Sequence, residues 1–95
     1  MITFTAPLWL WTGGKGGWHF ITVPEQLAHE LRAESFASPR GFGSVKVQAS
    51  IGDISWRTSV FPQKDGTYLL PVKADVRRRA AISVDDHVTF RLELI

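Results

Sequence analysis

The chain has 95 residues, 44% of them hydrophobic and 21% charged, which is an ordinary composition for one globular domain over residues 1–95. It has no cysteine, which excludes disulfides and thiolate metal sites, and its net charge of +2 permits an anionic partner without requiring one. No apolar run reaches about 18 residues and the N-terminus lacks a basic flank, so we expect a cytoplasmic protein with no membrane span and no signal peptide.

Residues 2–11 are predicted to form one long strand whose two faces differ. Strict alternation places one set of apolar side chains on the first face: Ile2, Phe4, Ala6, Leu8 and Leu10. The second face carries Trp9 and Trp11, so it is partly aromatic. Pro7 lacks a backbone N–H, which indicates a bulge or an edge position in the sheet.

A glycine-rich segment, residues 12–17, separates this strand from a second one predicted at residues 18–23. Two strands joined in this way indicate a hairpin. A phosphate-binding loop is the alternative, since the segment contains a lysine. That loop needs the lysine to be followed by Ser or Thr and then by a helix, whereas Lys15 is followed by Gly16 and a strand. The pattern therefore favours a hairpin loop.

The middle of the chain is predicted as a helix, a loop and two strands. Pro24 opens the helix at its favoured first position, and the helix ends near Ser35 after an apolar stripe of Leu27, Ala28 and Leu31. Residues 36–43 form a loop, and alternation then predicts strands at residues 45–50 and 54–60 with a tight turn between them. Phe61 and Pro62 are expected to break the second strand before an Asp65-Gly66 turn that tolerates positive φ.

Residues 68–94 are predicted to form a strand, a helix, a polar turn and a last strand. Pro71 marks the point where the first strand leaves its ladder, and the helix covers residues 74–81. This order resembles that of residues 18–49, which indicates either a weak internal repeat or a chance resemblance, since a strand followed by a proline-led helix is common. Neither segment can cover its own apolar face, whereas interlocked segments can. We therefore expect an all-β fold with two short helices, in which about six strands form a small closed or double-split β-barrel capped by the helices.

Separated motifs in the right order resemble a small bacterial domain-of-unknown-function family over roughly residues 2–94. They lie in WHFITVP (Trp18–Pro24), GFGSVKVQASIGDISWRTSVFP (Gly41–Pro62) and GTYLLPVKADVR (Gly66–Arg77). The family occurs alone or fused to a bacteriocin-protection region of the YdeI/OmpD-associated type. The resemblance implies a double-split β-barrel, a fold shared with swapped-hairpin transcription factors of the AbrB and MazE type. Where the family usually carries Gly-Asp before the last strand, this chain has Asp85 and Asp86.

The sequence shows no catalytic or metal-binding constellation. His19, His29 and His87 fall in different elements and lack the close spacing of metal ligands, and His29 is expected on the exposed side of its helix. No serine lies in a nucleophile elbow, and no pair of carboxylates can be assigned to acid–base work. We therefore expect no catalytic residues, no metal and no cofactor. His19, next to Trp18, is the histidine that an enzyme with a barrel pocket would use.

Aromatic and basic residues give the candidate binding site. The face of Trp9 and Trp11 is either covered core, which is the more frequent arrangement, or an open surface on which an aromatic ligand, a base or a peptide stacks. Lys73 and Arg77 lie four residues apart at the start of the second helix, where they form either an anion site or part of a solvated cationic face. Arg40 and Lys46 flank the glycines of the loop predicted at residues 36–43. The predicted ligand-binding residues are Lys73, Arg77, Trp18 and Lys46.

The function that follows is a small non-enzymatic binding module, a monomer or homodimer, for an unidentified small ligand or anion. Two alternatives stay open. Nucleic-acid binding rests on fold analogy with the swapped-hairpin factors and predicts affinity for DNA that falls steeply with salt. A small enzyme requires a deep pocket that gathers a titratable group with a shifted pKa, and a solid interior would count against it.

Overall fold

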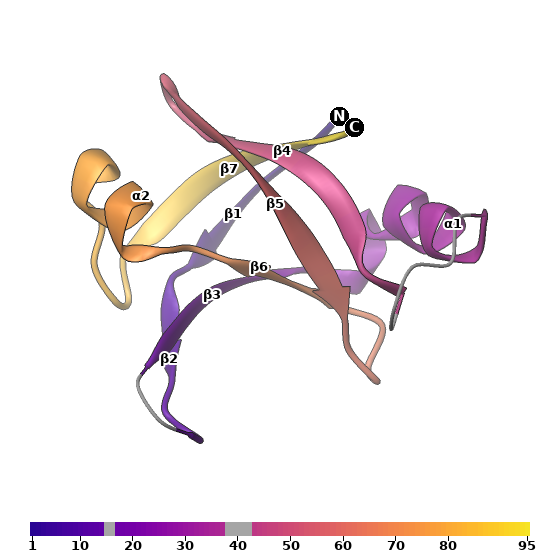
Figure 1. Ribbon diagram of the computed structural model, residues 1–95, viewed down its shortest axis with the longest axis horizontal. Coiled ribbons are helices and arrows are strands. Elements are labelled where there is room, and N and C mark those ends of the chain that lie inside the picture. The colour runs from indigo at the N-terminus through magenta and orange to yellow at the C-terminus, as the bar shows by residue number, and fades with distance from the viewer. Residues whose placement is uncertain (15–16, 38–42) are drawn as a thin grey trace.

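The structure, a computed structural model, describes residues 1–14, 17–37 and 43–95. Seven antiparallel strands form one sheet that curls into a half-barrel, and two short α-helices lie at opposite sides of it (Figure 1). The elements are β1 (Ile2–Pro7), β2 (Trp9–Trp11), β3 (Trp18–Val23), the 3₁₀ turn η1 (Glu25–Leu27), α1 (His29–Ala37), β4 (Val45–Ile51), β5 (Ile54–Pro62), β6 (Tyr68–Pro71), α2 (Ala74–Ala80) and β7 (His87–Leu94). The all-β prediction with two short helices is confirmed, whereas the closed barrel of about six strands is not.

The seventh strand arises because residues 2–11 form two strands instead of one. β1 pairs with β7, and β2 pairs with β3 at the other end of the sheet. Leu8 lies between them, and its N–H and C=O bond Asp86 O at 3.0 Å and Asp85 N at 2.8 Å, in the turn before β7. The backbone of Leu8 is thus held by that turn while the chain passes from one ladder to the other. Pro7 is the last residue of β1, an end strand of the sheet, as its missing N–H requires.

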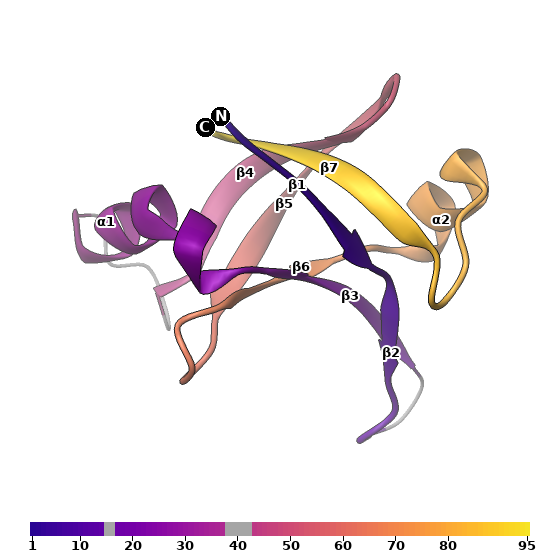
Figure 2. The same cartoon turned by 180° about the vertical axis from the view of Figure 1, so that it is seen from behind.

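The N-terminal and C-terminal parts of the chain interlock. The strand order is β1-β7-β4-β5-β6-β3-β2, so the C-terminal β7 lies between β1 and β4, and β6 lies between β5 and β3. The repeated segments predicted from the sequence meet through equivalent strands, since β3 pairs with β6 and β4 with β7. Figure 2 shows β1 and β7 side by side with the two chain ends together. Neither part completes the sheet alone, in agreement with the predicted interlocking.

The first helix differs from its prediction. Pro24 is the cap of a 3₁₀ turn and not the first residue of an α-helix, which begins at His29. The turn bonds Leu27 N to Pro24 O at 3.0 Å and leaves Leu27 39% exposed. Ala28 and Leu31 alone of the predicted stripe are buried, because the tighter 3₁₀ winding turns Leu27 away from the core. His29 is exposed, as predicted.

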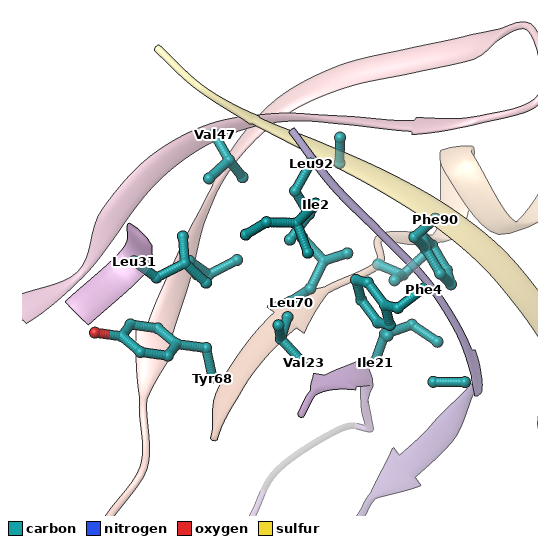
Figure 3. Close-up of a cluster of buried hydrophobic side chains, with 14 of the residues drawn as sticks. Ile2, Phe4, Ile21, Val23, Leu31, Val47, Tyr68, Leu70, Phe90 and Leu92 are labelled. Carbon is teal, nitrogen blue, oxygen red and sulfur yellow. The ribbon is translucent and has the colours of Figure 1, made fainter. Parts of the chain in front are cut away.

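The concave side of the sheet is filled by apolar side chains (Figure 3). Phe4 and Phe90 stack across β1 and β7 with ring centroids 6.0 Å apart, and Leu31 and Val76 bring in α1 and α2. Most of the predicted alternation is confirmed in β1, β4 and β7, but Leu94 at the end of β7 and Leu10 in β2 are 40% and 42% exposed. Within the described residues, no helix is long and apolar enough to cross a membrane.

Two turns show why the sequence carries its turn residues. Phe61 and Pro62 do not break β5, because they pair with Leu69 and Tyr68 and form its end. The turn that follows has Gly66 at φ 91°, the positive value predicted for Asp65-Gly66.

In the turn before β7, Asp85 adopts φ 76°. Asp85 therefore takes the left-handed conformation at the position where the resemblance implies glycine.

Replacing Asp85 by glycine should stabilise the protein by about 0.5–1 kcal/mol, because glycine adopts positive φ without the steric penalty of a Cβ. Glycine also keeps the backbone N–H that bonds Leu8 O. Urea unfolding of the wild type and Asp85→Gly measures the difference. Asp86→Gly is the matched control and should destabilise, since Asp86 Oδ2 accepts a bond from Ser83 N at 2.8 Å. A less stable Asp85→Gly protein would contradict this account of the turn.

Candidate ligand-binding site

The convex side of the sheet carries an open hollow that we call the aromatic groove. It has a volume of about 520 Å³ and is lined by Trp9, Trp11, Trp18, Phe20, Phe61, Gln63 and Leu69. Trp18, Trp11 and Phe61 are 53%, 44% and 42% exposed, so their rings are in contact with solvent. The lining is almost wholly apolar, and its volume lies within the range of roughly 300–1,000 Å³ that small-molecule sites occupy.

Strand alternation and register bring these side chains together. In β3, Ile21 and Val23 point into the core, so Trp18 and Phe20 point outward. Trp11 pairs directly with Trp18, and Trp9 with Phe20, across the β2–β3 hairpin. The rings of Trp9 and Phe20 are 5.3 Å apart, and those of Trp18 and Phe20 are 6.2 Å apart and nearly parallel. β6 and β5 complete the row through the Leu69–Phe61 pair.

The interpretation of Trp9 and Trp11 as covered core is wrong. The groove is lined by β2, β3, β5, β6 and the turn residue Gln63, and no helical residue lines it in the part of the chain described. Trp9 is half-buried and donates from Nε1 to Thr22 Oγ1 at 3.0 Å, which fixes its ring. Trp11 lies over Gly13, where a Cβ would come within 2.5 Å of the indole. Glycine at position 13 therefore permits the wall that Trp11 forms.

A second hollow, the cationic pocket, adjoins the groove through Trp18. It has a volume of about 300 Å³ and is lined by Gly17, Trp18, His19, Pro71, Val72, Lys73, Ala74 and Arg77. Three of the four predicted site residues, Trp18, Lys73 and Arg77, thus share one hollow. Arg77 is half-buried and donates from one terminal nitrogen to Val72 O at 2.7 Å, whereas Arg78 and Arg79 are exposed and pair with Asp75.

His19 is the histidine of the cationic pocket. Its Nδ1 is buried and has no hydrogen-bond partner among the described residues. Burial, and secondly the positive charge of Arg77, hold the pKa of His19 below its ordinary value of 6.5. The imidazole is therefore neutral near pH 7 and keeps one donor and one acceptor nitrogen. The pocket combines two cations with a neutral imidazole that lacks a partner.

The profile of a domain of unknown function, DUF1905, matches residues 4–92 of the chain. The chain belongs to the DUF1905 family. A search of curated proteins found no match. The family assignment supports the resemblance to a small domain of unknown function that the motifs indicated.

The fourth predicted residue lies elsewhere in the DUF1905 domain. Lys46 lines a separate hollow with Arg57, Thr58, Ser59 and Ile95, so the structure does not bring it to Trp18, Lys73 and Arg77. Arg40, predicted beside Lys46, and Lys15, the lysine of the glycine-rich segment, lie outside the described residues. The strands that flank this segment, β2 and β3, are paired and antiparallel, which confirms the hairpin.

The DUF1905 domain should lose stability as the pH falls below 6.5, and His19 should account for part of the loss. Because the folded state disfavours the imidazolium, the unfolded chain binds the proton at higher pH than the folded one. Urea unfolding at about pH 7.5 and pH 5.5 should show a smaller decrease for His19→Gln than for the wild type. Hydrogen bonds from Thr67 lower the pKa of Asp65. This carboxylate therefore adds to the loss of stability only when the pH falls below its ordinary pKa of 3.8. Equal decreases in both proteins would contradict the assignment.

The side chains that line the two hollows are mostly aromatic, apolar and cationic. The described lining of the cationic pocket contains no carboxylate and no hydroxyl that could act with His19 as acid, base or nucleophile. Among the described residues, no group of three His, Asp or Glu side chains could hold a metal ion. Sequence reasoning missed Phe20, Leu69 and Phe61 as site residues. The outward positions of the strand at residues 18–23 were the available signal for Phe20, whereas Phe61 was interpreted as a strand breaker.

Proposed function

We propose that this DUF1905 domain is a non-enzymatic binding module, and that its ligand places a flat apolar ring in the aromatic groove. The observation that carries the proposal is the open row of aromatic side chains on the convex sheet face. Rings of this kind bind other flat rings by offset stacking and by burial of apolar area. Monomers rarely leave large connected apolar surfaces open without a partner, so the groove is a candidate for occupation.

The absence of turnover is part of the same proposal. Apolar side chains fill the concave side of the sheet, where an enzyme of this size with a barrel pocket would need space for a substrate. The shifted histidine that such an enzyme requires is present, but the charged residues in the described lining of its pocket are the cations Lys73 and Arg77, with no carboxylate to orient the imidazole. This supports recognition of a ligand over its conversion.

We also propose a finer architecture for the curled sheet. The end strands of the sheet, β1 and β2, are consecutive in the chain and are joined at Leu8. We infer that this junction makes the curled sheet behave as a double-split barrel. The barrel holds the convex face stiff, because both ladders are anchored at one residue. A rigid aromatic face loses little conformational entropy when a ring binds to it.

A neutral fluorescent ring compound, N-phenyl-1-naphthylamine, tests the groove directly. Its emission should rise on binding, and the titration should saturate at one molecule per chain. Light scattering of the same samples gives the oligomeric state. A compound that fails to bind, or a dimer that binds it only after dissociation, would contradict the proposal. The second of these outcomes would show that a second copy of the chain covers the groove.

A further inference from the structure

We propose that the ligand of this domain is a small aromatic anion, with its ring in the aromatic groove and its acidic group in the cationic pocket. The inference rests on the proposed function and adds the second half of the ligand. The geometry behind it is the position of Trp18, which lines both hollows. One ligand that crosses Trp18 can therefore occupy both.

The charges of the two linings favour an anion. Lys73 and Arg77 are the charged side chains of the cationic pocket, and the described lining of either hollow contains no carboxylate that would repel a negative group. Lys73 is exposed, and a hydrogen bond from the Arg77 guanidinium to Val72 O fixes the position of that side chain. A guanidinium has five N–H donors, so Arg77 retains donors for a carboxylate, sulfonate or phosphate oxygen.

His19 supplies the second line of support. A buried nitrogen without a hydrogen bond costs free energy, and proteins satisfy the great majority of such atoms. Nδ1 of His19 is one of these atoms and belongs to a side chain that lines the cationic pocket. An acidic group bound beside it would accept a hydrogen bond from the imidazole. The lining of the cationic pocket thus combines two cations with a histidine that has an unsatisfied ring nitrogen.

A small ligand fits these charges better than a nucleic-acid strand does. Binding along a phosphate backbone needs several neutralised phosphates, and the affinity then falls steeply with salt. The net charge of the chain is only +2, and a separate hollow lined by Lys46 and Arg57 does not share a residue with the groove. The site therefore offers one anion-binding position beside one ring-binding position.

Two matched fluorescent compounds separate the ring from the charge. N-phenyl-1-naphthylamine and 8-anilino-1-naphthalenesulfonate share the ring system, and only the second carries a sulfonate. The anionic compound should bind about tenfold more tightly, which is ~1.4 kcal/mol. Lys73→Ala should remove most of that advantage without changing the binding of the neutral compound. Lys46→Ala, which removes an equal charge from the separate hollow, should leave both affinities unchanged.

The histidine gives a readout that a non-specific charge effect would not move. The anionic compound should raise the pKa of His19, measured by NMR titration of its imidazole, whereas the neutral compound should not. The other charged groups that line its pocket are Lys73 and Arg77. If both compounds bind equally, the inference is overturned and the proposed function stands. If neither binds, both are overturned. Tighter, strongly salt-dependent binding of oligodeoxythymidylate would overturn the inference in favour of a nucleic-acid strand.

Discussion

Phe90→Ala should lower the free energy of unfolding by about 3–5 kcal/mol, which is a large part of the stability of a domain of this size. Phe90 is completely buried in β7 and stacks on Phe4 of β1. It therefore joins the C-terminal strand to the N-terminal one at the point where the two parts of the chain interlock. Urea unfolding followed by circular dichroism measures the loss.

Glu93→Ala is the matched control for this change, since Glu93 is an exposed residue of the same strand. Its free energy of unfolding should stay within about 0.5 kcal/mol of the wild type. A single cooperative transition is expected for both proteins, because neither part of the chain completes the sheet alone. Two separate transitions, or a loss below about 1 kcal/mol for Phe90→Ala, would contradict the interlocked arrangement.

Trp18→Ala should weaken the binding of N-phenyl-1-naphthylamine by at least about tenfold, or ~1.4 kcal/mol. The substitution removes the ring that stacks on Phe20 and forms the wall between the two hollows. Because Trp18 is 53% exposed, the fold should lose only about 1 kcal/mol or less. A fluorescence titration at a temperature where both proteins are folded gives the comparison.

Phe36→Ala controls for the loss of any exposed aromatic ring, since Phe36 is 85% exposed in α1 and does not line the groove. Its affinity for the neutral compound should equal that of the wild type. Equal weakening by the two substitutions would show that the compound binds exposed rings without preference. Unchanged binding by Trp18→Ala would place the ligand outside the groove.

The sequence determines much of this fold because local patterns and global packing agree. In β4, β5 and β7 the alternation of apolar and polar residues allows one orientation of each strand, which buries Val45, Val60 and Phe90. The periodicity was therefore sufficient to predict these strands. The split of residues 2–11 could not be read in the same way. It depends on the backbone of Leu8 bonding the turn at Asp85 and Asp86, a contact between distant residues that leaves no periodic signal. Leu27 was misplaced because apolar spacing alone does not distinguish a 3₁₀ turn from an α-helix.

The candidate site was predictable in its polar half and only partly in its aromatic half. The spacing of Lys73 and Arg77 was enough to place them together, since residues four apart share a helix face. The groove depends on which strands are neighbours, and the register that sets Trp11 beside Trp18 follows from the hairpin. Phe61 belongs to the groove because β5 pairs with β6. The sequence did not indicate this pairing, because the proline after Phe61 was interpreted as the end of the strand.

The four tryptophan indoles offer the most direct test that the aromatic face is a binding site. In ¹⁵N-labelled protein, addition of N-phenyl-1-naphthylamine should shift the indole resonances of Trp11 and Trp18, which line the groove, and leave that of the buried Trp56 in place. A shift confined to Trp56, or no shift of any indole at saturating compound, would contradict the account.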